Sequence, residues 1–528
     1  MEKKNLKIIS LISLILIVVT SLPYLYAWLS QPTNTFYLGN GLFNPHDNHV
    51  YYAYIEQAKA GHWLFYDVFT PEQHKPFLHI FWLIVGWLAK LFTLSPIWAF
   101  HLSRILLIPL FVFTIFKFLR RVWHNDPKQN LKTTLALILF FFSTSLGGWI
   151  ALFGKVKIFY TTEAWWPEAY AFTSIYATPH FIASWILIVA SLYFYLDGIQ
   201  NKNYKKIILG GILGAILTQF HTFYLALLIP LTLVFALVEV KKNQRIVLWQ
   251  TLVYYSFFLP VIAYYFWMTI TDMVMAKRLT ENLMLTPGLF YVFSAFSLLF
   301  LCAIIGLVLF FQNQEKNIFK KLLIIWLIIV PFLLYSGLPF ERRLVEGWQL
   351  PVVVLAIETL WIFYQKISFK KSFLILIIVL LASSSLFVFM LETFIPQQKT
   401  ERRMYYLSTD VRQALLWLKQ TDPDFSKIVL AAPLTGINAT FLANKTIFLG
   451  HGLETLSANQ KKEDWLNFIN NNTDEEKKID FLKKWKIDYL FWGPYEQMTK
   501  PQFKPAEKPY LHPIYQNAKV TIYQVITN

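Results

Sequence analysis

Long apolar runs follow one another through residues 7–392 of this 528-residue chain. A run of about 20 apolar residues crosses a membrane as a helix, because the bilayer holds no water to satisfy free backbone amides. Eleven runs are long enough, and they lie near residues 7–28, 97–119, 132–153, 180–198, 205–221, 223–240, 247–268, 288–311, 319–337, 348–365 and 371–392. The sequence therefore predicts an all-α polytopic membrane protein with about 11 transmembrane helices.

The composition agrees with a membrane protein and argues against two other classes. Apolar residues make up 56% of the chain and charged residues 15%, which is too apolar for a soluble enzyme. The net charge is +17, but Lys and Arg stand in short clusters between apolar runs, a pattern typical of membrane orientation and not of nucleic-acid binding. The single cysteine, Cys302, excludes a disulfide within the chain and argues against a cysteine-based metal site.

The basic clusters predict the orientation, because Lys and Arg are enriched on the cytoplasmic side of membranes. They lie at residues 3–7, 120–132, 202–206, 241–245, 316–321 and 366–371. All six face one side only if the shorter apolar run at 77–92 lies at the outer interface instead of crossing. We therefore expect an uncleaved first span, a cytoplasmic N-terminus, an outward C-terminus, and outer loops at 29–96, 154–180, 269–287 and 338–347.

The composition changes after residue 393, where Lys, Asp, Asn and Pro become frequent and spanning runs stop. Four short apolar stretches predict strands, and helical stretches lie near 411–420, 460–470 and 474–485. Such alternation is typical of a small α/β domain. We expect two domains, a transmembrane domain at 1–395 that includes the outer loop 29–96, and an extracytoplasmic α/β domain at 396–528.

The first outer loop carries a dense group of titratable residues at 44–79. Polar chemistry against a membrane face is typical of a functional site. Asp47 starts a helical pattern that Gly61 ends, with His49 and Glu56 on its polar side, so we expect a helix lying flat on the membrane. Asp47 has two interpretations, a helix N-cap and a general base that takes the proton of an attacking hydroxyl.

An acid after the first span, a long outer loop and a Lys-Pro pair before an interfacial helix resemble the GT-C superfamily of membrane glycosyltransferases. Protein O-mannosyltransferases and lipid A aminoarabinose transferases are the families that the chain resembles. The latter carry Glu-Lys-Pro-Pro before a Leu-x-Tyr-Trp helix, where this chain has QHKPFLHIFW at 73–82. The Lys-Pro pair is kept, but His74 replaces the Glu and Phe77 the second Pro. The resemblance covers about residues 1–395.

The resemblance implies an inverting enzyme that moves a sugar from a polyprenyl-phosphate donor to a lipid, glycan or protein acceptor. Asp47 would be the general base, and His49 is a second catalytic candidate. Lys75 and Arg104 would bind the donor phosphate, although Lys75 also fits a lysine that snorkels to the interface. A divalent metal is left open as a cofactor, but no ligand is assigned, because the spacing of the loop histidines fits no standard zinc site: His49, His62, His74 and His79.

The second outer loop, 154–180, is where GT-C enzymes often place another acid. The candidates in this loop are Glu163, Glu168 and His180. Aromatic side chains beside them either stack on a sugar or form an interfacial aromatic belt: Trp165, Trp166 and Tyr170.

The loop at 338–347 places Arg342 and Arg343 on the outer face, against the usual charge bias. A grip on a lipid phosphate would explain both arginines, and pairing with neighbouring glutamates is the structural alternative. In the tail, His451 and Glu454 lie in a glycine-flanked loop that suits an acceptor contact or a solvated turn.

Three classes of function are compatible with the sequence. A glycosyltransferase explains why the titratable groups gather on the outer face. A transporter or flippase would need charges inside the spans and broken helices in paired halves, and the spans contain few charges. A non-catalytic membrane scaffold would tolerate the replacement of Asp47 without loss of any chemistry.

Overall fold

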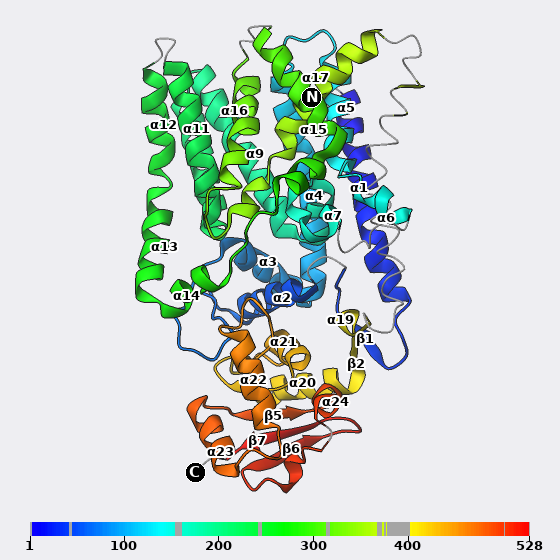
Figure 1. Ribbon diagram of the computed structural model, residues 1–528, viewed down its shortest axis with the longest axis vertical. Helices are drawn as coiled ribbons and strands as arrows, with labels where there is room; N and C mark the ends of the chain where they lie inside the picture. Colours follow the sequence, from blue (N-terminus) through cyan, green and yellow to red (C-terminus); the bar gives the residue numbers. More distant parts are fainter. Residues whose placement is uncertain are drawn as a thin grey trace. The chain divides into compact units, whose positions relative to one another are not determined.

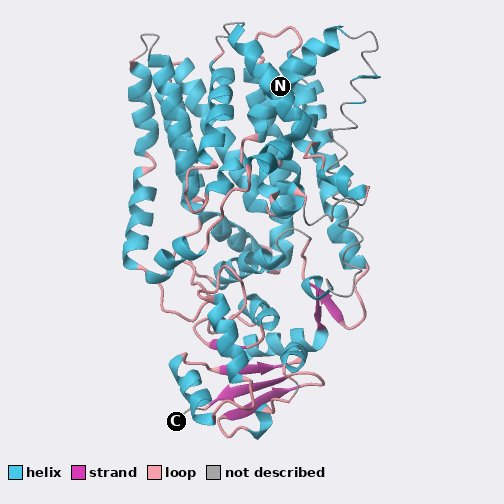
Figure 2. Cartoon of the chain, in the orientation of Figure 1, coloured by secondary structure: helices cyan, strands magenta, loops and turns pink. Residues whose placement is uncertain are grey.

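The computed structural model describes residues 3–41, 45–153, 161–240, 245–312, 317–366, 372–373, 376, 402–500 and 502–526. The chain forms two compact units. The first comprises Met1–Pro23, His101–Phe266 and Leu283–Ile395. The second comprises Tyr24–Phe100, Trp267–Asn282 and Pro396–Asn528. Figure 1 labels the elements of both units, and Figure 2 distinguishes their helices from their strands.

The first unit is helical in the parts that the structure describes (Figure 2). Its elements are α1 (Lys3–Leu29), α4 (Pro96–Val122), α5 (Gln129–Phe142), α6 (Gly147–Leu152), α7 (Thr162–Trp165), η2 (Pro167–Ala169), α8 (Ala171–Ala177), α9 (Pro179–Gln200), α10 (Tyr204–Phe220), η3 (Thr222–Tyr224), α11 (Leu225–Val240), α12 (Ile246–Ser256), α13 (Leu259–Thr271), α15 (Leu289–Gln312), α16 (Ile318–Leu333), η4 (Glu341–Val345) and α17 (Gln349–Lys366). Helices α1, α4 and α13 also contribute residues to the second unit.

Six helices of the described chain are long and apolar enough to cross a membrane, and the pair α12 and α13, bent by 46°, makes a seventh if it is one span. Each coincides with a predicted run, so the chain is a multi-pass membrane protein with mostly helical structure. Helices α10 and α16 match two more predicted runs but have only 17 and 16 residues. The run at 132–153 contains two separate helices, α5 and α6, and the run at 371–392 lies largely outside the described residues. The count of 11 spans stays a prediction.

The predicted orientation can be measured by thiol labelling. Single cysteines at Ala60, Trp165 and Gln460 should react with a membrane-impermeant reagent added outside, and one at Asn125 should react only after permeabilisation. Ala60, Gln460 and Asn125 are exposed, so burial would not explain a failure to react. Labelling at Asn125 in intact cells would contradict the orientation and make 77–92 a true span.

The second unit combines helices with the strands of the chain (Figure 2). Its first two segments contain β1 (Thr35–Tyr37), α2 (Pro45–Ala60), α3 (Ile80–Leu91) and α14 (Met273–Glu281). Its last segment contains α19 (Arg402–Tyr405), β2 (Tyr406–Ser408), α20 (Thr409–Thr421), β3 (Ile428–Leu430), α21 (Pro433–Leu442), β4 (Thr446–Ile447), α22 (Ala458–Phe468), α23 (Glu475–Lys484), β5 (Tyr489–Trp492), α24 (Pro494–Thr499), η6 (Pro505–Glu507), β6 (Leu511–Gln516) and β7 (Thr521–Val525). The tail thus packs with two earlier segments, whereas the split at residue 395 predicted from sequence follows composition alone.

The tail folds around a five-stranded sheet in the order β4-β3-β5-β7-β6. Strand β3 pairs in parallel with β4 and β5, and β7 pairs antiparallel with β5 and β6. The aromatic residues Trp465, Phe468 and Phe448 pack with the apolar side chains of β3 and β5 to form the core. The predicted α/β arrangement is confirmed, including four of its strands and the helices α20, α22 and α23.

Helix α2 has a buried polar side, and the prediction that it lies flat on the membrane stays a prediction. It ends at Ala60 as expected, with Gly61 at φ +110°, a conformation that glycine adopts without steric cost. Its polar side is buried instead of solvated, because α2 packs against α21 of the tail, and the Glu56 carboxylate pairs with Lys419 Nζ at 2.5 Å. The polar residues of α2 were therefore a sign of an internal contact within the second unit.

Helix α3 packs on the opposite side of α2. A Cβ atom on Gly86 would lie 2.2 Å from Ala58 Cβ, so these two small residues let the helices approach closely. The buried Trp82 stacks on Tyr51 with ring centroids 4.7 Å apart. Lys90 is exposed in the last turn of α3, and the other exposed residues of α3 and its end are apolar, which suits the predicted position at a membrane interface: Ile84, Trp87, Leu91 and Phe92.

Candidate functional site

Asp47 lies in the first turn of α2, two residues after the helix begins at Pro45. The interpretation as an N-cap is therefore wrong, because the helix starts before Asp47. A carboxylate in the first turn is still favoured by the helix dipole. Its side chain is 29% exposed, so the carboxylate is accessible to another molecule.

His451 supplies the hydrogen-bond partner of Asp47. It follows β4 in the chain and is buried, and its Nε2 lies 3.0 Å from Asp47 Oδ1. The backbone N–H groups of Leu453 and Glu454 both donate to Nδ1 of His451, at 3.1 Å. Nδ1 therefore acts as an acceptor, and we infer that Nε2 carries the hydrogen given to Asp47. The two residues are 404 positions apart in the chain.

Burial and the neighbouring charges shift the pKa values of His451 and His46 in opposite directions. Burial lowers the pKa of His451, but the hydrogen bond with Asp47 and the charge of Glu454 raise it more, and the net shift is upward. The ring of His46 lies 6.4 Å from that of His451, edge-on. Burial and the proximity of His451 lower the pKa of His46, partly offset by Asp47.

A buried ion cluster adjoins the loop that carries His451. Arg278 of α14 pairs with Asp67 through Nη2 and with the Glu454 carboxylate through Nη1, at 2.9 Å for the latter. Arg278 also donates to the backbone carbonyl of Glu454 at 2.6 Å. Burial raises the pKa of Asp67, while Arg278 opposes the rise. The cluster joins the three segments of the second unit, since each residue comes from a different one.

His49 occupies the core and not the accessible surface beside Asp47. Its ring packs edge-on against Phe441 and close to Tyr52, and its Nδ1 lies 2.9 Å from the carbonyl of Pro45. Burial, with the proximity of His46, lowers the pKa of His49 to about 3, so the ring is neutral. The catalytic role predicted for His49 stays a prediction, and the geometry gives it a packing role.

The four histidines considered for a metal do not come together. In the described part of the chain, no three His, Cys, Asp or Glu side chains are placed to hold a metal ion. His74 Nε2 accepts a hydrogen bond from the backbone N–H of Asp67, and His62 packs edge-on against Phe425. These contacts hold the loop 62–79 in shape.

Lys75 lies in the second unit but contacts neither Asp47 nor His451 among its described contacts. Its Nζ lies 4.6 Å from the centroid of the Trp267 ring, a cation–π distance. Its backbone N–H donates to Asp272 Oδ2 at 2.5 Å, and Asp272 also caps α14. A part-exposed lysine against a tryptophan fits both of its sequence interpretations, phosphate binding and interfacial anchoring.

The first unit brings together candidates from two loops that the sequence predicts to lie on the outer side. Arg342 Nη2 lies 3.9 Å from Glu168 Oε1, and the carbonyl of Arg342 accepts a hydrogen bond from Trp166 Nε1 at 3.2 Å. The guanidinium also faces Trp165 at 5.8 Å. Arg343 donates to Met284 Sδ and lies 5.7 Å from the Phe223 ring.

The aromatic residues of the second loop are not equally available. Trp166 and Tyr170 are fully buried, so the prediction that they stack on a sugar or line an interfacial belt is wrong for both. Their rings pack inside the unit because Tyr170 donates to the carbonyl of Ala295 at 2.7 Å and Trp166 to that of Arg342. Trp165 alone of the three is partly exposed.

Glu163 and His180 each have buried polar partners. Glu163 accepts from Ser145 Oγ at 2.7 Å, and a Cβ on Gly147 would lie 2.3 Å from its Oε2, so the glycine makes room for the carboxylate. His180 Nδ1 lies 2.7 Å from Thr178 Oγ1, and its ring is 5.0 Å from that of His221.

Arg104 is buried in α4, where its guanidinium bonds to α1. Nη1 donates to Thr20 Oγ1 at 2.9 Å, and Nη2 donates to Ser21 Oγ at 3.0 Å. These bonds give Arg104 a structural role within the first unit. Its phosphate-binding role remains a prediction.

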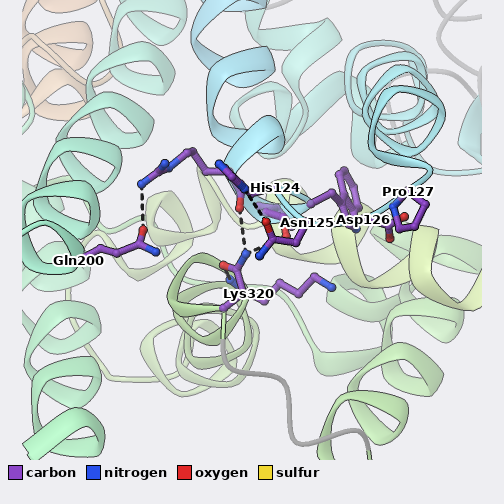
Figure 3. Close-up of a pocket in the computed structure, with 10 residues that line it drawn as sticks. His124, Asn125, Asp126, Pro127, Gln200 and Lys320 are labelled. Atoms are coloured by element: carbon purple, nitrogen blue, oxygen red, sulfur yellow. Dashed lines mark hydrogen bonds between the residues drawn. The ribbon is translucent and has the colours of Figure 1, made fainter.

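Two pockets among the described residues are lined by residues other than Asp47 and His451. The pocket in Figure 3, about 690 Å³, lies in the first unit between His124–Pro127, Gln200 and Lys320. Its charged groups are already paired, since Lys320 pairs with Glu358 and the neighbouring Arg121 with Asp197. A pocket of about 610 Å³ in the second unit lies between residues 62–74 and the start of β3.

The fold can be compared with solved structures. The apo oligosaccharyltransferase of Archaeoglobus fulgidus matches with a TM-score of 0.53 and 12% identity over 91% of this chain and 69% of its own. AglB of the same organism, in complex with an inhibitory peptide and a dolichol-phosphate, gives 0.52 and 12% over the same shares. ArnT of Cupriavidus metallidurans, bound to undecaprenyl phosphate, gives 0.52 and 11% over 96% and 97%. The chain has the GT-C fold.

The resemblance predicted from the Lys-Pro loop is thus confirmed at the level of the fold. ArnT matches along nearly its whole length, so the GT-C likeness includes the tail as well as the membrane part. No family model and no curated protein matches the sequence. The activity of this chain must therefore be argued from its own residues.

Proposed function

We propose that this protein transfers a sugar from a polyprenyl-phosphate donor to an acceptor at the outer face of the membrane, with inversion at the anomeric carbon. The GT-C fold supports this class, because two solved structures of that fold hold a dolichol-phosphate or an undecaprenyl phosphate. The observation that carries the proposal is the carboxylate of Asp47, which is partly exposed and held in one direction by a buried histidine.

The proposed step uses Asp47 as the general base. The acceptor hydroxyl attacks the anomeric carbon from the face opposite the phosphate, a new C–O bond forms, and the bond to the phosphate oxygen breaks. The electron pair leaves with the polyprenyl phosphate, and the hydroxyl proton passes to Asp47. A carboxylate within hydrogen-bond reach of the hydroxyl is the group that this step requires.

The decisive experiment offers the purified protein a panel of polyprenyl-phosphate sugars and a crude envelope fraction as acceptor, and follows sugar transfer by mass spectrometry. Transfer with inverted stereochemistry supports the proposal. Movement of the intact lipid-linked sugar across a vesicle, without cleavage, would contradict the proposal and identify a flippase. A protein that performs neither reaction with any donor would be a scaffold.

The donor phosphate is predicted to be bound by Lys75, Arg342 and Arg343. Each change to Ala should weaken donor binding by about 1.5–3 kcal/mol, because a charge-assisted hydrogen bond to phosphate is lost. Binding of a fluorescent polyprenyl phosphate in detergent measures the effect. Lys504→Ala is the control, since Lys504 is exposed and, among the described residues, pairs with Glu507. Donor affinities equal to the control in all three variants would remove the phosphate role from these residues.

A further inference from the structure

We propose that His451 is a positioning residue of the transfer reaction, which holds the catalytic carboxylate of Asp47 by donating the Nε2–H hydrogen bond. The inference rests on the proposed function, because it needs Asp47 to act as the base. It makes the C-terminal α/β segment part of the catalytic machinery. The tail would then be required for chemistry and not only for acceptor contact.

The direction of the hydrogen bond follows from the other nitrogen of the ring. Two backbone N–H groups point at Nδ1, so Nδ1 uses its lone pair on them and the hydrogen lies on Nε2. Nε2 carries that hydrogen whether the ring is neutral or charged. His451 can therefore donate to Asp47, but it cannot take the proton from Asp47 through Nε2. Its role is to orient the carboxylate, not to relay a proton.

The histidine is itself held rigidly. The loop from His451 to Thr455 is fixed at three points: Thr455 Oγ1 donates to the carbonyl of Phe69 at 2.9 Å, Glu454 pairs with Arg278, and the His451 ring packs edge-on against Phe69. A Cβ on the flanking Gly450 would lie 2.2 Å from Ile447 Cδ1 and 3.1 Å from the backbone N of Ile437, so a larger residue there would displace the Ile447 side chain. A hydrogen-bond donor held this rigidly loses little conformational freedom when the substrate binds.

The contact has a defined consequence for Asp47. His451 occupies Oδ1, and among the described residues the Asp47 carboxylate makes no other hydrogen bond. The carboxylate is thus limited in rotation while its second oxygen remains available to an acceptor hydroxyl. A hydrogen bond donated to a carboxylate also favours the charged form, which is the form that a general base needs.

The experiment compares two replacements of His451. His451→Phe keeps an aromatic ring in the space but removes the donor, and His451→Gln keeps an N–H at nearly the distance of Nε2. We expect His451→Phe to lower kcat by about 10- to 100-fold with the KM for the donor nearly unchanged, the scale of a misplaced catalytic group. His451→Gln should restore kcat to within about fivefold of the parent, since it supplies the same hydrogen bond.

The pH profile separates positioning from a structural effect. The acid limb of kcat reports protonation of the essential base, and loss of the hydrogen bond should move it upward by about half to one pH unit in His451→Phe and not in His451→Gln. The other titratable groups around the pair are unchanged in both variants: His46, His49, Asp67, Arg278 and Glu454.

The outcomes are distinct from those that test the proposed function. If Asp47→Asn is inactive while His451→Phe keeps the parent kcat and pH profile, the base survives and the positioning role is overturned. If His451→Phe and His451→Gln lose activity equally, and the acid limb of the kcat–pH profile stays at the pH of the parent, His451 has only a structural role. That result would also overturn the inference. If Asp47→Asn is fully active, it is the proposed function that fails.

Discussion

An Asp47→Asn protein should transfer sugar about 10²- to 10⁴-fold more slowly than the parent, the usual contribution of positioned acid–base catalysis. The amide has the size of the carboxylate, and its Oδ1 can still accept the hydrogen bond from His451 Nε2. What the amide lacks is the ability to take a proton from the acceptor hydroxyl. The rate of transfer, measured with saturating donor and acceptor, isolates this loss.

A folding defect should not account for the slower transfer by Asp47→Asn. Because Asn preserves the contact with His451, the thermal midpoint of Asp47→Asn should remain close to that of the parent. Asp47→Ala removes the contact and should cost about 0.5–1.5 kcal/mol, the net worth of one hydrogen bond. Parent-level transfer by Asp47→Asn would end the catalytic assignment and leave Asp47 as a tether between α2 and the tail.

The membrane helices were predictable because a spanning helix must satisfy its own backbone and therefore appears as one long apolar run. Four tail strands were predictable by the same kind of local rule, whereas the short β2 and strand β6 were not predicted. Strand β6 contains Pro513, which weakens a strand assignment, and the structure places β6 at the edge of the sheet with a bulge next to Pro513. Helix α21 was also missed, since Gly436 and two threonines lower its helix propensity.

The chemistry of the site was predictable only in part. Asp47 and Lys75 stood out because they lie in a loop rich in titratable residues that contains a recognisable Lys-Pro pair, and their roles stay predictions. The burial of the polar face of α2 was not predicted, since Glu56 has its partner, Lys419, 363 positions away. Local periodicity shows which face of a helix is polar, but it does not show whether water or another segment covers that face.

His451 shows the same limit most clearly. The sequence signal was a histidine between two glycines after a strand, which marks a tight loop and no particular chemistry. Its function depends on a bond to a residue 404 positions earlier, and no spacing rule reaches that far. Buried aromatic residues give a second case, because Trp166 and Tyr170 look like sugar platforms until their burial is known.

Replacing Arg278 with Met should destabilise the second unit by about 3–5 kcal/mol, the cost of leaving a buried charge without its partner. Asp67 is almost fully buried and the Arg278 side chain is only 15% exposed, so water cannot replace the missing guanidinium. Hydrogen exchange of α20 and β3 and the thermal midpoint in detergent would both report the loss. Asp67→Asn combined with Arg278→Met should recover part of it, because the amide carries no charge.

The matched control is Lys277→Met on the same helix. Lys277 is 45% exposed and pairs with Glu281 four residues later, so its loss should cost less than about 1 kcal/mol. Equal stability of the two variants would mean that Asp67 and Glu454 do not depend on Arg278.

If Asp67 and Glu454 depend on Arg278, the loss of Arg278 should also lower the rate of transfer. Arg278 anchors Glu454, and the N–H of Glu454 holds Nδ1 of His451, so Arg278→Met should lower kcat in the same direction as His451→Phe, whereas Lys277→Met should not.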